Sequence, residues 1–205
     1  MVSLAAQPHQ VWTFDRLDQL AGHPVRLQGH PRVIDSTVGK AVHFNGVDDA
    51  MFVDVHPLAG AGSFTWEVLF RPDHDGAPEQ RFFHLQEEGT NNRMLFEIRI
   101  VDCQWFLDSF VNSGAASKAL MNRQRLHPLD RWYRVAMVYD GREFRNYVDG
   151  VLEGSAEIQF APQRDGRTSA GVRINLKDYF KGAIRSARFT HKALQPAEFA
   201  ALPSQ

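Results

Sequence analysis

The sequence is poor in cysteine, in long apolar stretches and in net charge, and each shortage excludes a class of protein. Cys103 is the single cysteine, so an internal disulfide is excluded, and its apolar neighbours predict a thiol packed in or near a strand. The apolar stretches are far shorter than the roughly 20 residues needed to cross a bilayer, so we expect no membrane span. With 23 basic and 24 acidic residues, no overall field attracts nucleic acid or an anionic membrane, and any charged recognition must be local.

The beginning of the chain lacks the features of a secretory signal. Residues 1–10, MVSLAAQPHQ, have neither a basic region nor an apolar region. A trimmed or processed start would look the same, so the sequence predicts a soluble protein and leaves its compartment open. It also leaves the number of subunits open.

Motifs of several enzyme classes are missing as well. The chain has no His-Glu-x-x-His, no phosphate-binding P-loop, no Gly-x-Ser-x-Gly and no cysteine pair. Metalloprotease, nucleotide-binding, serine-hydrolase and zinc-site hypotheses therefore lack a motif to support them.

Short apolar or alternating runs recur along the whole chain between turn signals such as Asp149-Gly150, and they predict roughly a dozen strands. One helical turn is expected near residues 195–201, where Pro196 suits a first-turn position. Residues 110–125 are expected to form a loop. With no long helical pattern and no linker, the sequence predicts one all-β domain over residues 1–205, built as a two-sheet antiparallel sandwich. The expected strands are 11–14, 40–44, 50–55, 63–70, 81–85, 94–100, 104–111, 132–139, 144–148, 156–160, 171–176 and 183–190.

Four segments in order resemble the signature of laminin G-like jelly rolls of the concanavalin A-like type. They are FNGVDDAMFV (44–53), SFTWEVLFRP (63–72), DRWYRVAMVYDGREFRNYVDG (130–150) and FKGAIRSARFTHKALQPAEF (180–199). The resemblance implies a jelly-roll sandwich with one convex and one concave sheet. Domains of this kind include lectins, carbohydrate-binding modules, adhesion modules, glycoside hydrolases and polysaccharide lyases, so the fold alone does not select a function.

Trp132 is expected to fill the space between the two sheets, because a large aromatic residue at the start of a strand suits that position. Alternation along the other strands then divides their side chains between a core face and an outward face. If these strands line the concave sheet, the outward side chains converge on one polar surface, which Asn175 and Lys177 extend. The residues expected there are His84, Glu97, Arg99, Arg134, Arg145 and Tyr147.

Such a surface suits an acidic sugar or another ligand that carries a carboxylate, because guanidinium groups bind planar anions in a bidentate manner. The alternative is ordinary charge pairing between Glu97 and the arginines on a solvated face. We therefore predict carbohydrate binding by the concave face or the rim, with no cofactor required and no nucleic-acid or membrane partner. The ligand-binding residues predicted are Glu97, Arg99, Arg134, Arg145, Tyr147 and Asn175.

Two further functions stay open at this point. A polysaccharide lyase acting on a uronic acid would need a group to neutralise the carboxylate, a base and an acid, and His84, Arg134 and Tyr147 have the required chemistry. A hydrolase is less favoured, because the E-x-D-x-x-E motif of laminarinase-like relatives is absent and Glu97 has no obvious partner. A protein-interaction module is the second alternative, and it predicts an exposed apolar patch.

Asp48 and Asp49 lie together in a predicted loop between two strands. Adjacent carboxylates repel each other unless they are solvated, capped by backbone amides or shared with a cation. Calcium at this rim is common in similar domains, so a structural calcium ion bound by these two residues is one hypothesis. Capping of the turn is the other.

Overall fold

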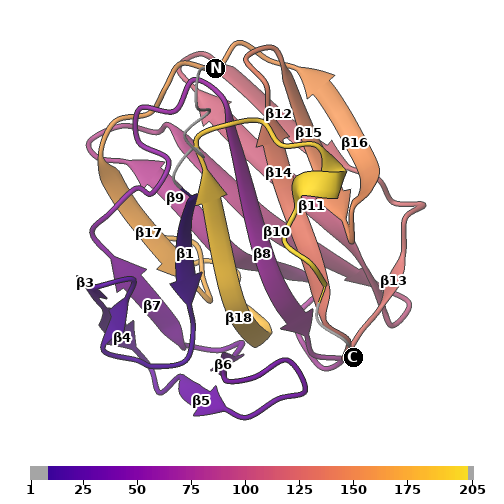
Figure 1. Cartoon of the computed structure of the whole chain (residues 1–205). Helices are drawn as coiled ribbons and strands as arrows, with labels where there is room; N and C mark the ends of the chain where they lie inside the picture. Colours follow the sequence, from indigo (N-terminus) through magenta and orange to yellow (C-terminus); the bar gives the residue numbers. More distant parts are fainter. Residues whose placement is uncertain (1–8, 203–205) are drawn as a thin grey trace, which may run out of the picture.

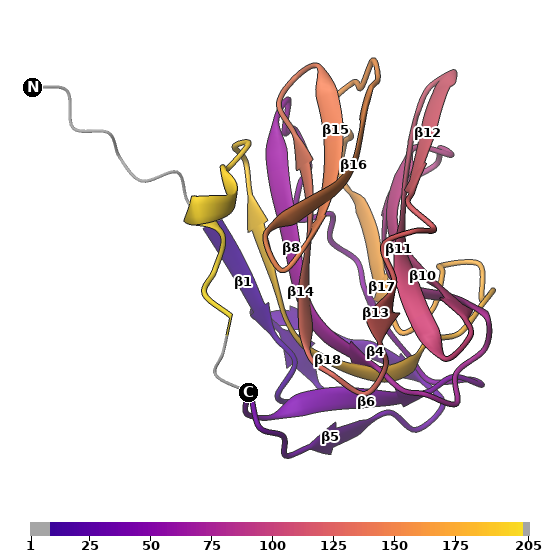
Figure 2. The same ribbon diagram turned by 90° about the vertical axis from the view of Figure 1, so that its right-hand side faces the viewer.

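A computed structural model describes residues 9–202 and contains a sandwich of two antiparallel sheets, which stand as two layers in Figure 2. Sheet I has the order β16-β15-β14-β8-β18-β6-β5, and β1 pairs with β18. Sheet II has the order β12-β11-β10-β9-β17-β7-β4, and β13 pairs with β11. The prediction of an all-β, two-sheet jelly-roll sandwich is therefore confirmed.

The strands of sheet I are β1 (His9–Thr13), β5 (Arg32–Ile34), β6 (Ala41–Asn45), β8 (Phe64–Pro72), β14 (Tyr133–Tyr139), β15 (Glu143–Val148), β16 (Val151–Glu157) and β18 (Lys181–Thr190). Those of sheet II are β4 (Arg26–Gln28), β7 (Ala50–Val53), β9 (Glu79–Glu87), β10 (Arg93–Val101), β11 (Gln104–Ser113), β12 (Ala116–Met121), β13 (His127–Pro128) and β17 (Gly166–Ala170). A small hairpin pairs β2 (Gln19–Leu20) with β3 (His23–Pro24). The predicted helical turn, Pro196–Glu198, is the short yellow coil in Figure 1. In residues 9–202 we find no helix with the length and apolar character of a membrane span.

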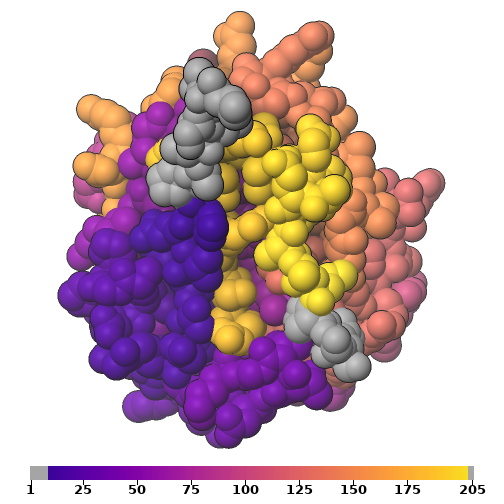
Figure 3. Space-filling view, in the orientation of Figure 1, coloured from indigo at the N-terminus to yellow at the C-terminus, as the bar shows by residue number. Residues whose placement is uncertain are grey.

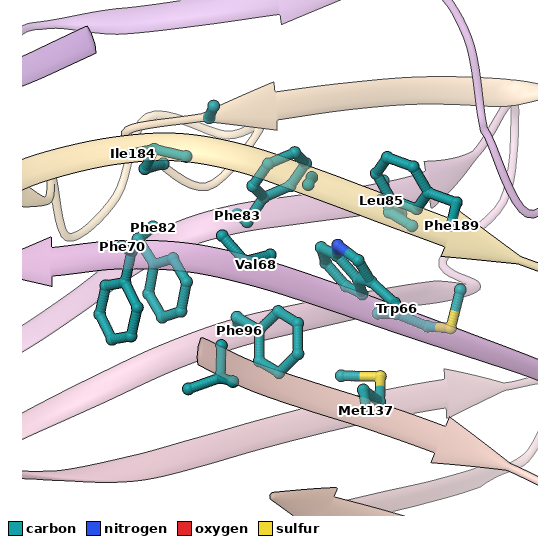
Figure 4. Close-up of a cluster of buried hydrophobic side chains, with 14 of the residues drawn as sticks. Trp66, Val68, Phe70, Phe82, Phe83, Leu85, Phe96, Met137, Ile184 and Phe189 are labelled. Atoms are coloured by element: carbon teal, nitrogen blue, oxygen red, sulfur yellow. The ribbon is translucent and has the colours of Figure 1, made fainter. Parts of the chain in front are cut away.

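Aromatic side chains fill the space between the sheets (Figure 4). Trp66 of β8 contacts Phe96 of β10 with ring centroids 4.5 Å apart, and Phe70 stacks on Phe82 at 4.3 Å. Burying such rings is the dominant favourable contribution to folding in a sandwich of this size. The same burial also decides which face of each strand points inward.

The alternation predicted for the central strands is confirmed by this core. On β14, Val135, Met137 and Tyr139 face the other sheet, whereas Ala136 and Val138 form a separate cluster on the outside of sheet I. Phe96 and Ile98 of β10 are in the core, which leaves Glu97 between them on the outside of sheet II. Period-two patterning therefore assigned inward and outward faces correctly.

Two-residue hairpin turns close β15–β16 and β10–β11. Asp149 and Gly150 have φ angles of 47° and 80°, as the prediction of a tight Asp-Gly turn requires. Asp102 and Cys103 have φ angles of 47° and 59° and form the tip of the other hairpin. Cys103 is therefore exposed at a turn beside two strands. The prediction that its thiol is packed against apolar neighbours is wrong.

Several boundaries differ from those expected. Residues 171–180 form a loop after β17, because the strand is the preceding segment 166–170. The stretch expected to be a loop at 110–125 contains the end of β11 and the whole of β12. Trp132 packs on the outside of sheet I against Leu69 and Ala183, so the prediction that it fills the space between the sheets is wrong.

The segment that follows β18 covers part of the outer face of sheet I. It is the yellow chain that lies beside the orange strands in Figures 1 and 3. The N–H of Leu194 donates to Thr65 Oγ1 at 2.8 Å, and the N–H of Ala200 donates to Glu67 Oε1 at 2.8 Å. The ring of Phe199 packs edge-on against Tyr147 with centroids 5.3 Å apart. This face is therefore partly buried by the chain itself.

We expect Tyr147→Ala to lower the free energy of unfolding by roughly 2 to 4 kcal/mol, because it removes a buried ring on which the C-terminal segment packs. Phe199→Ala should cost less, and the double variant should show a coupling of about 0.5 to 1.5 kcal/mol. Urea denaturation of the four proteins measures both quantities. Val151→Ala, at an exposed edge position, is the control and should change stability by less than about 0.5 kcal/mol. Strictly additive effects would contradict the packing described for Phe199.

Candidate functional site

The outer face of sheet II carries a group of four arginine side chains around a depression of about 210 Å³. Arg81 comes from β9, Arg93 and Arg99 come from β10, and Arg173 comes from the loop after β17. Alternation explains Arg93 and Arg99, because the core takes Phe96 and Ile98 and leaves odd-numbered positions of β10 outside. Arg81 lies opposite Glu97 because the register between β9 and β10 shifts there, with both Phe82 and Phe83 in the core. The full lining is Arg81, Arg93, Leu95, Glu97, Arg99, Asp108, Phe110, Ala119, Met121 and Arg173.

Two of the four arginines are neutralised by carboxylates. Arg81 pairs with Glu97, Nε to Oε2 at 3.0 Å, and also with Asp178. Arg99 pairs with Asp108, Nη2 to Oδ2 at 3.0 Å, and with Glu79 of β9. Burial raises the pKa of the carboxyl groups of Glu97 and Asp108, and the arginines partly offset that effect.

The other two arginines, Arg93 and Arg173, have no carboxylate within ion-pair distance in the described part of the chain. The Nε of each is buried without a hydrogen-bond partner among residues 9–202. Desolvation lowers the pKa of both guanidinium groups, and each is further lowered by a neighbouring arginine. The guanidinium of Arg93 lies 4.8 Å from the centroid of the Phe110 ring, which holds it on this face.

His84 of β9 is the buried member of the site, with 1% of its surface exposed. Its Nδ1 accepts a hydrogen bond from the backbone N–H of Ile174 at 3.0 Å, so in the neutral ring the hydrogen is on Nε2. This Nε2 is buried and has no partner within the described residues. Burial lowers the pKa of His84 well below its ordinary value, and the charges of Arg173, Arg93 and Arg81 lower it further. The ring is therefore a neutral donor without an acceptor.

The groups left without a partner in this arrangement are all hydrogen-bond donors. Arg93, Arg173 and His84 all offer N–H donors, and the nearby carboxylates are engaged by Arg81 and Arg99. Unmet donors of positive charge in a partly desolvated depression are complementary to an anion such as a carboxylate or a sulfate. Neutral imidazole adds a hydrogen bond without adding to the repulsion among the arginines.

The structure separates the residues predicted to converge into two groups. His84, Glu97 and Arg99 lie on the outside of sheet II, and Asn175 lies in the adjoining loop, next to the Ile174 amide that bonds His84. In contrast, three of the predicted residues lie in sheet I, on the outside of the opposite layer: Arg134, Arg145 and Tyr147. The expected convergence of all of them on one surface is therefore wrong.

Strand pairing gives the physical reason for this separation. β14 pairs with β15 on one side and with β8 on the other, whereas β9 and β10 belong to the other sheet. Outward positions of the two sheets point in opposite directions. Arg134 donates to the carbonyl of Ala201, and Tyr147 lies against Phe199, so both help to dock the C-terminal segment. Arg145 pairs with Asp140 and Glu143. The set His84, Arg134 and Tyr147, considered above for a lyase, is thus split between two faces.

Four site residues were missed by sequence reasoning. Arg93 and Asp108 follow from the alternation already applied, since Arg93 continues the outward row of Glu97, and Asp108 lies directly opposite Glu97 on β11. Arg81 also begins a run that was read as a strand. Arg173 could not be found in this way, because its segment was expected to be a strand and is a loop.

Asp48 and Asp49 are engaged in turn capping. The Oδ1 of Asp49 accepts the backbone N–H of His30 at 2.6 Å, and its Oδ2 accepts that of Asn45 at 3.0 Å. Asp48 Oδ1 accepts from the side chain of Asn45 at 2.8 Å. These contacts account for two adjacent acids without a cation. Calcium at this loop stays a prediction.

A larger hollow, of about 980 Å³, lies elsewhere, between the β11–β12 turn, the β14–β15 turn and residues 157–161. The hydroxyl of Tyr139 donates to the carbonyl of Ile158, and Arg142 pairs with Glu157. None of its described lining residues has a buried polar side-chain atom that lacks a partner. Volume alone therefore does not make it the stronger site, and we favour the arginine face.

Sequence comparison assigns the family. The model of the concanavalin A-like lectin/glucanases superfamily matches residues 45–200. The chain belongs to this superfamily. No curated protein matches the sequence.

Solved structures with the same fold include proteins that bind sugars. Domain 4 of AbnA, a GH43 extracellular arabinanase from Geobacillus stearothermophilus solved with arabinotriose, aligns over 92% of this chain and 94% of its own, with 19% identity and a TM-score of 0.68. The receptor binding domain of botulinum neurotoxin D aligns over 92% of this chain and 50% of its own, with 13% identity and a TM-score of 0.67. A third structure is from botulinum neurotoxin type C, a toxin whose cell entry depends on interaction with two ganglioside molecules. It aligns over 93% of this chain and 49% of its own, with 12% identity and a TM-score of 0.66. This chain thus spans about half the length of the toxin domains, and the likeness at these identities concerns the fold.

Stability should depend on pH through His84. Below about pH 6.5 the unfolded chain binds a proton on this ring and the folded chain does not, so the free energy of unfolding falls as the pH falls, by at most about 1.4 kcal/mol per pH unit. Urea denaturation between about pH 5.5 and 7.5 should show a smaller slope for His84→Gln than for the original protein.

His56→Gln is the matched variant, because burial also lowers the pKa of His56. The pH dependence of its free energy of unfolding should also be weaker than that of the original protein. In the double variant, the reductions caused by the two substitutions should add. A slope that does not change in the His84 variant would mean that this ring takes up a proton in the folded state, contrary to its neutral, donor role.

Proposed function

We propose that this domain is a carbohydrate-binding module that holds the carboxylate or sulfate group of an acidic glycan on the outer face of sheet II. One observation carries the proposal: the Nε2–H of His84 and the Nε–H groups of Arg93 and Arg173 are buried without an acceptor among residues 9–202. Arg93 Nη1 donates to Asn91, but neither guanidinium group has a carboxylate partner in this part of the chain. An anion bound there would accept hydrogen bonds from all three and relieve the repulsion between the two arginines.

The family and the structural neighbours support a glycan as the ligand class. The superfamily comprises lectins and glucanases, one neighbour was solved with arabinotriose, and another belongs to a toxin that depends on gangliosides. Those ligands belong to the neighbours, at 19% identity or less. The arginine face of this chain is what directs our proposal toward an acidic sugar.

Binding is favoured over turnover by the residues around the depression. A lyase needs a base and a proton donor for the leaving oxygen, and the tyrosine and arginine considered for it, Tyr147 and Arg134, belong to the opposite layer. Glu97 and Asp108 face each other across β10 and β11, but arginines engage both. His84 stays neutral and offers only a hydrogen bond. Since the described lining residues include no unpaired carboxylate or tyrosine that could transfer a proton at the sugar, we expect the site to bind its ligand and release it unchanged.

The test is calorimetric titration with glucuronate and galacturonate oligosaccharides and with their neutral counterparts, glucose and galactose oligosaccharides. We expect binding of the acidic series only, weakened by added salt because screening reduces the attraction between charges. Arg93→Gln with Arg173→Gln should weaken binding at least about tenfold, since each hydrogen bond to a charged group contributes about 1.5 to 3 kcal/mol. Absorbance in the region of unsaturated uronates, followed in the same samples, should not rise.

Arg145→Gln provides the comparison for the opposite face, because this arginine is on the outside of sheet I. It should bind as the original protein does. Loss of binding in Arg145→Gln with retention in the Arg93 and Arg173 variant would move the site to sheet I and refute our proposal. New absorbance on an acidic glycan would instead identify a lyase.

A further inference from the structure

The depression among the four arginines is small, and part of its lining is apolar. Its volume of about 210 Å³ is below the roughly 300 to 1,000 Å³ of pockets that hold drug-sized ligands, so it suits one sugar residue rather than several. Phe110, Ala119 and Met121 line it together with the charged side chains. The unmet donors are therefore only one part of what this depression offers to a ligand.

Phe110 of β11 places an aromatic ring beside the anion-binding groups. The centroid of this ring lies 4.8 Å from the guanidinium carbon of Arg93, so a ligand bound by Arg93 lies next to the ring. Arg93 covers one part of the ring, and Phe110 is still partly exposed where it lines the depression. Ala119 lies directly opposite Phe110 on β12, and its methyl group is too small to cover the ring from that side. An aromatic surface is therefore available close to the bound anion.

The same depression also contains hydrogen-bond acceptors. The ion pairs with Arg81 and Arg99 are made through Oε2 of Glu97 and Oδ2 of Asp108. The second oxygen of each carboxylate, Oε1 and Oδ1, can accept a hydrogen bond from a hydroxyl group of a ligand. Asp108 is two residues from Phe110 on the same side of β11, a separation of about 7 Å. Acceptors and the aromatic ring are thus within the span of one sugar residue.

We propose that the depression is a subsite for one whole acidic sugar residue, with its anionic group at Arg93 and Arg173 and the C–H face of its pyranose ring on Phe110. Its hydroxyl groups then lie toward Glu97 and Asp108. This inference rests on the proposed function and specifies how the ligand is recognised. An isolated anion such as acetate has no ring to pack on Phe110 and no hydroxyl groups to donate. Phe110 is therefore the residue that distinguishes an acidic sugar from other anions.

The experiment compares the methyl glycosides of glucuronic and galacturonic acid with acetate, titrated into the protein at one ionic strength and followed by backbone amide chemical shifts. The better-bound uronide should bind at least about tenfold more tightly than acetate, because it carries the same carboxylate and adds the contacts of the ring. Phe110→Leu should weaken uronide binding about three- to tenfold and leave acetate within about twofold, because the substitution removes the flat aromatic surface. An equal loss for acetate would show that Phe110 only holds Arg93, and would overturn the inference.

Phe160→Leu is the matched control, because Phe160 is a partly exposed phenylalanine that lines the larger hollow instead. This variant should bind the uronides and acetate as the original protein does. Weaker uronide binding in the Phe160 variant, with unchanged binding in the Phe110 variant, would place the sugar in that hollow and overturn the inference.

The length of the ligand gives a second readout. A uronate trisaccharide should bind within about threefold of the better uronide, since its three residues are alternatives for one subsite. A gain of more than about tenfold would mean that groups outside the depression hold most of the ligand, contrary to the inference. Uronides bound no more tightly than acetate, with the acidic oligosaccharides still bound, would overturn this inference and leave the proposed function standing. Failure of those oligosaccharides to bind would overturn both.

Discussion

Burial of one aromatic layer between the two sheets is the constraint on which the rest of the structure depends. Trp66, Phe70, Phe82 and Phe96 must face inward, and in a strand this commits every second residue to the outside. Arg93, Glu97 and Arg99 are therefore not placed by attraction to one another. The core places them, and the ion pairs with Arg81 and Asp108 then form between side chains that are already neighbours.

The two outer faces differ because the chain covers only one of them. The segment after β18 docks on sheet I through Thr65, Glu67 and Tyr147, and Arg134 donates to its Ala201 carbonyl. The Nε atoms of Arg134 and Arg145 are buried on this face without a hydrogen-bond partner among the described residues, but the chain itself covers part of the face. No such segment in residues 9–202 lies on the arginine group of sheet II, and the loop after β17 supplies Arg173 beside it. A face that the chain covers contributes to the stability of the fold, whereas an uncovered face with unmet donors is suited to a ligand.

The sequence predicts the architecture and the inward and outward faces of individual strands, but it does not predict which strands pair with each other. Alternation gave the outward positions of Glu97, Arg134 and Tyr147 correctly, because period two is a local property. Which sheet each strand joins depends on pairings between distant segments, such as β14 with β8, and no local pattern encodes these. For the same reason Asp108 was not recognised as the partner of Glu97, and Arg173, on a loop, had no pattern to reveal it.

The arrangement around His84 also explains how one site can hold several cations in a folded protein. The charges of Arg81 and Arg99 are compensated by carboxylates. The ring of His84 stays neutral, because burial and its cationic neighbours oppose protonation. Of the four arginines, Arg93 and Arg173 are left without a carboxylate partner among residues 9–202. Desolvation and mutual repulsion make these two guanidinium groups less favourable than in water. The cost is part of the stability of the unbound domain, and an anion that neutralises both groups recovers it as affinity. The unfavourable electrostatics of this face and the expected preference for an acidic ligand are thus two consequences of the same contacts.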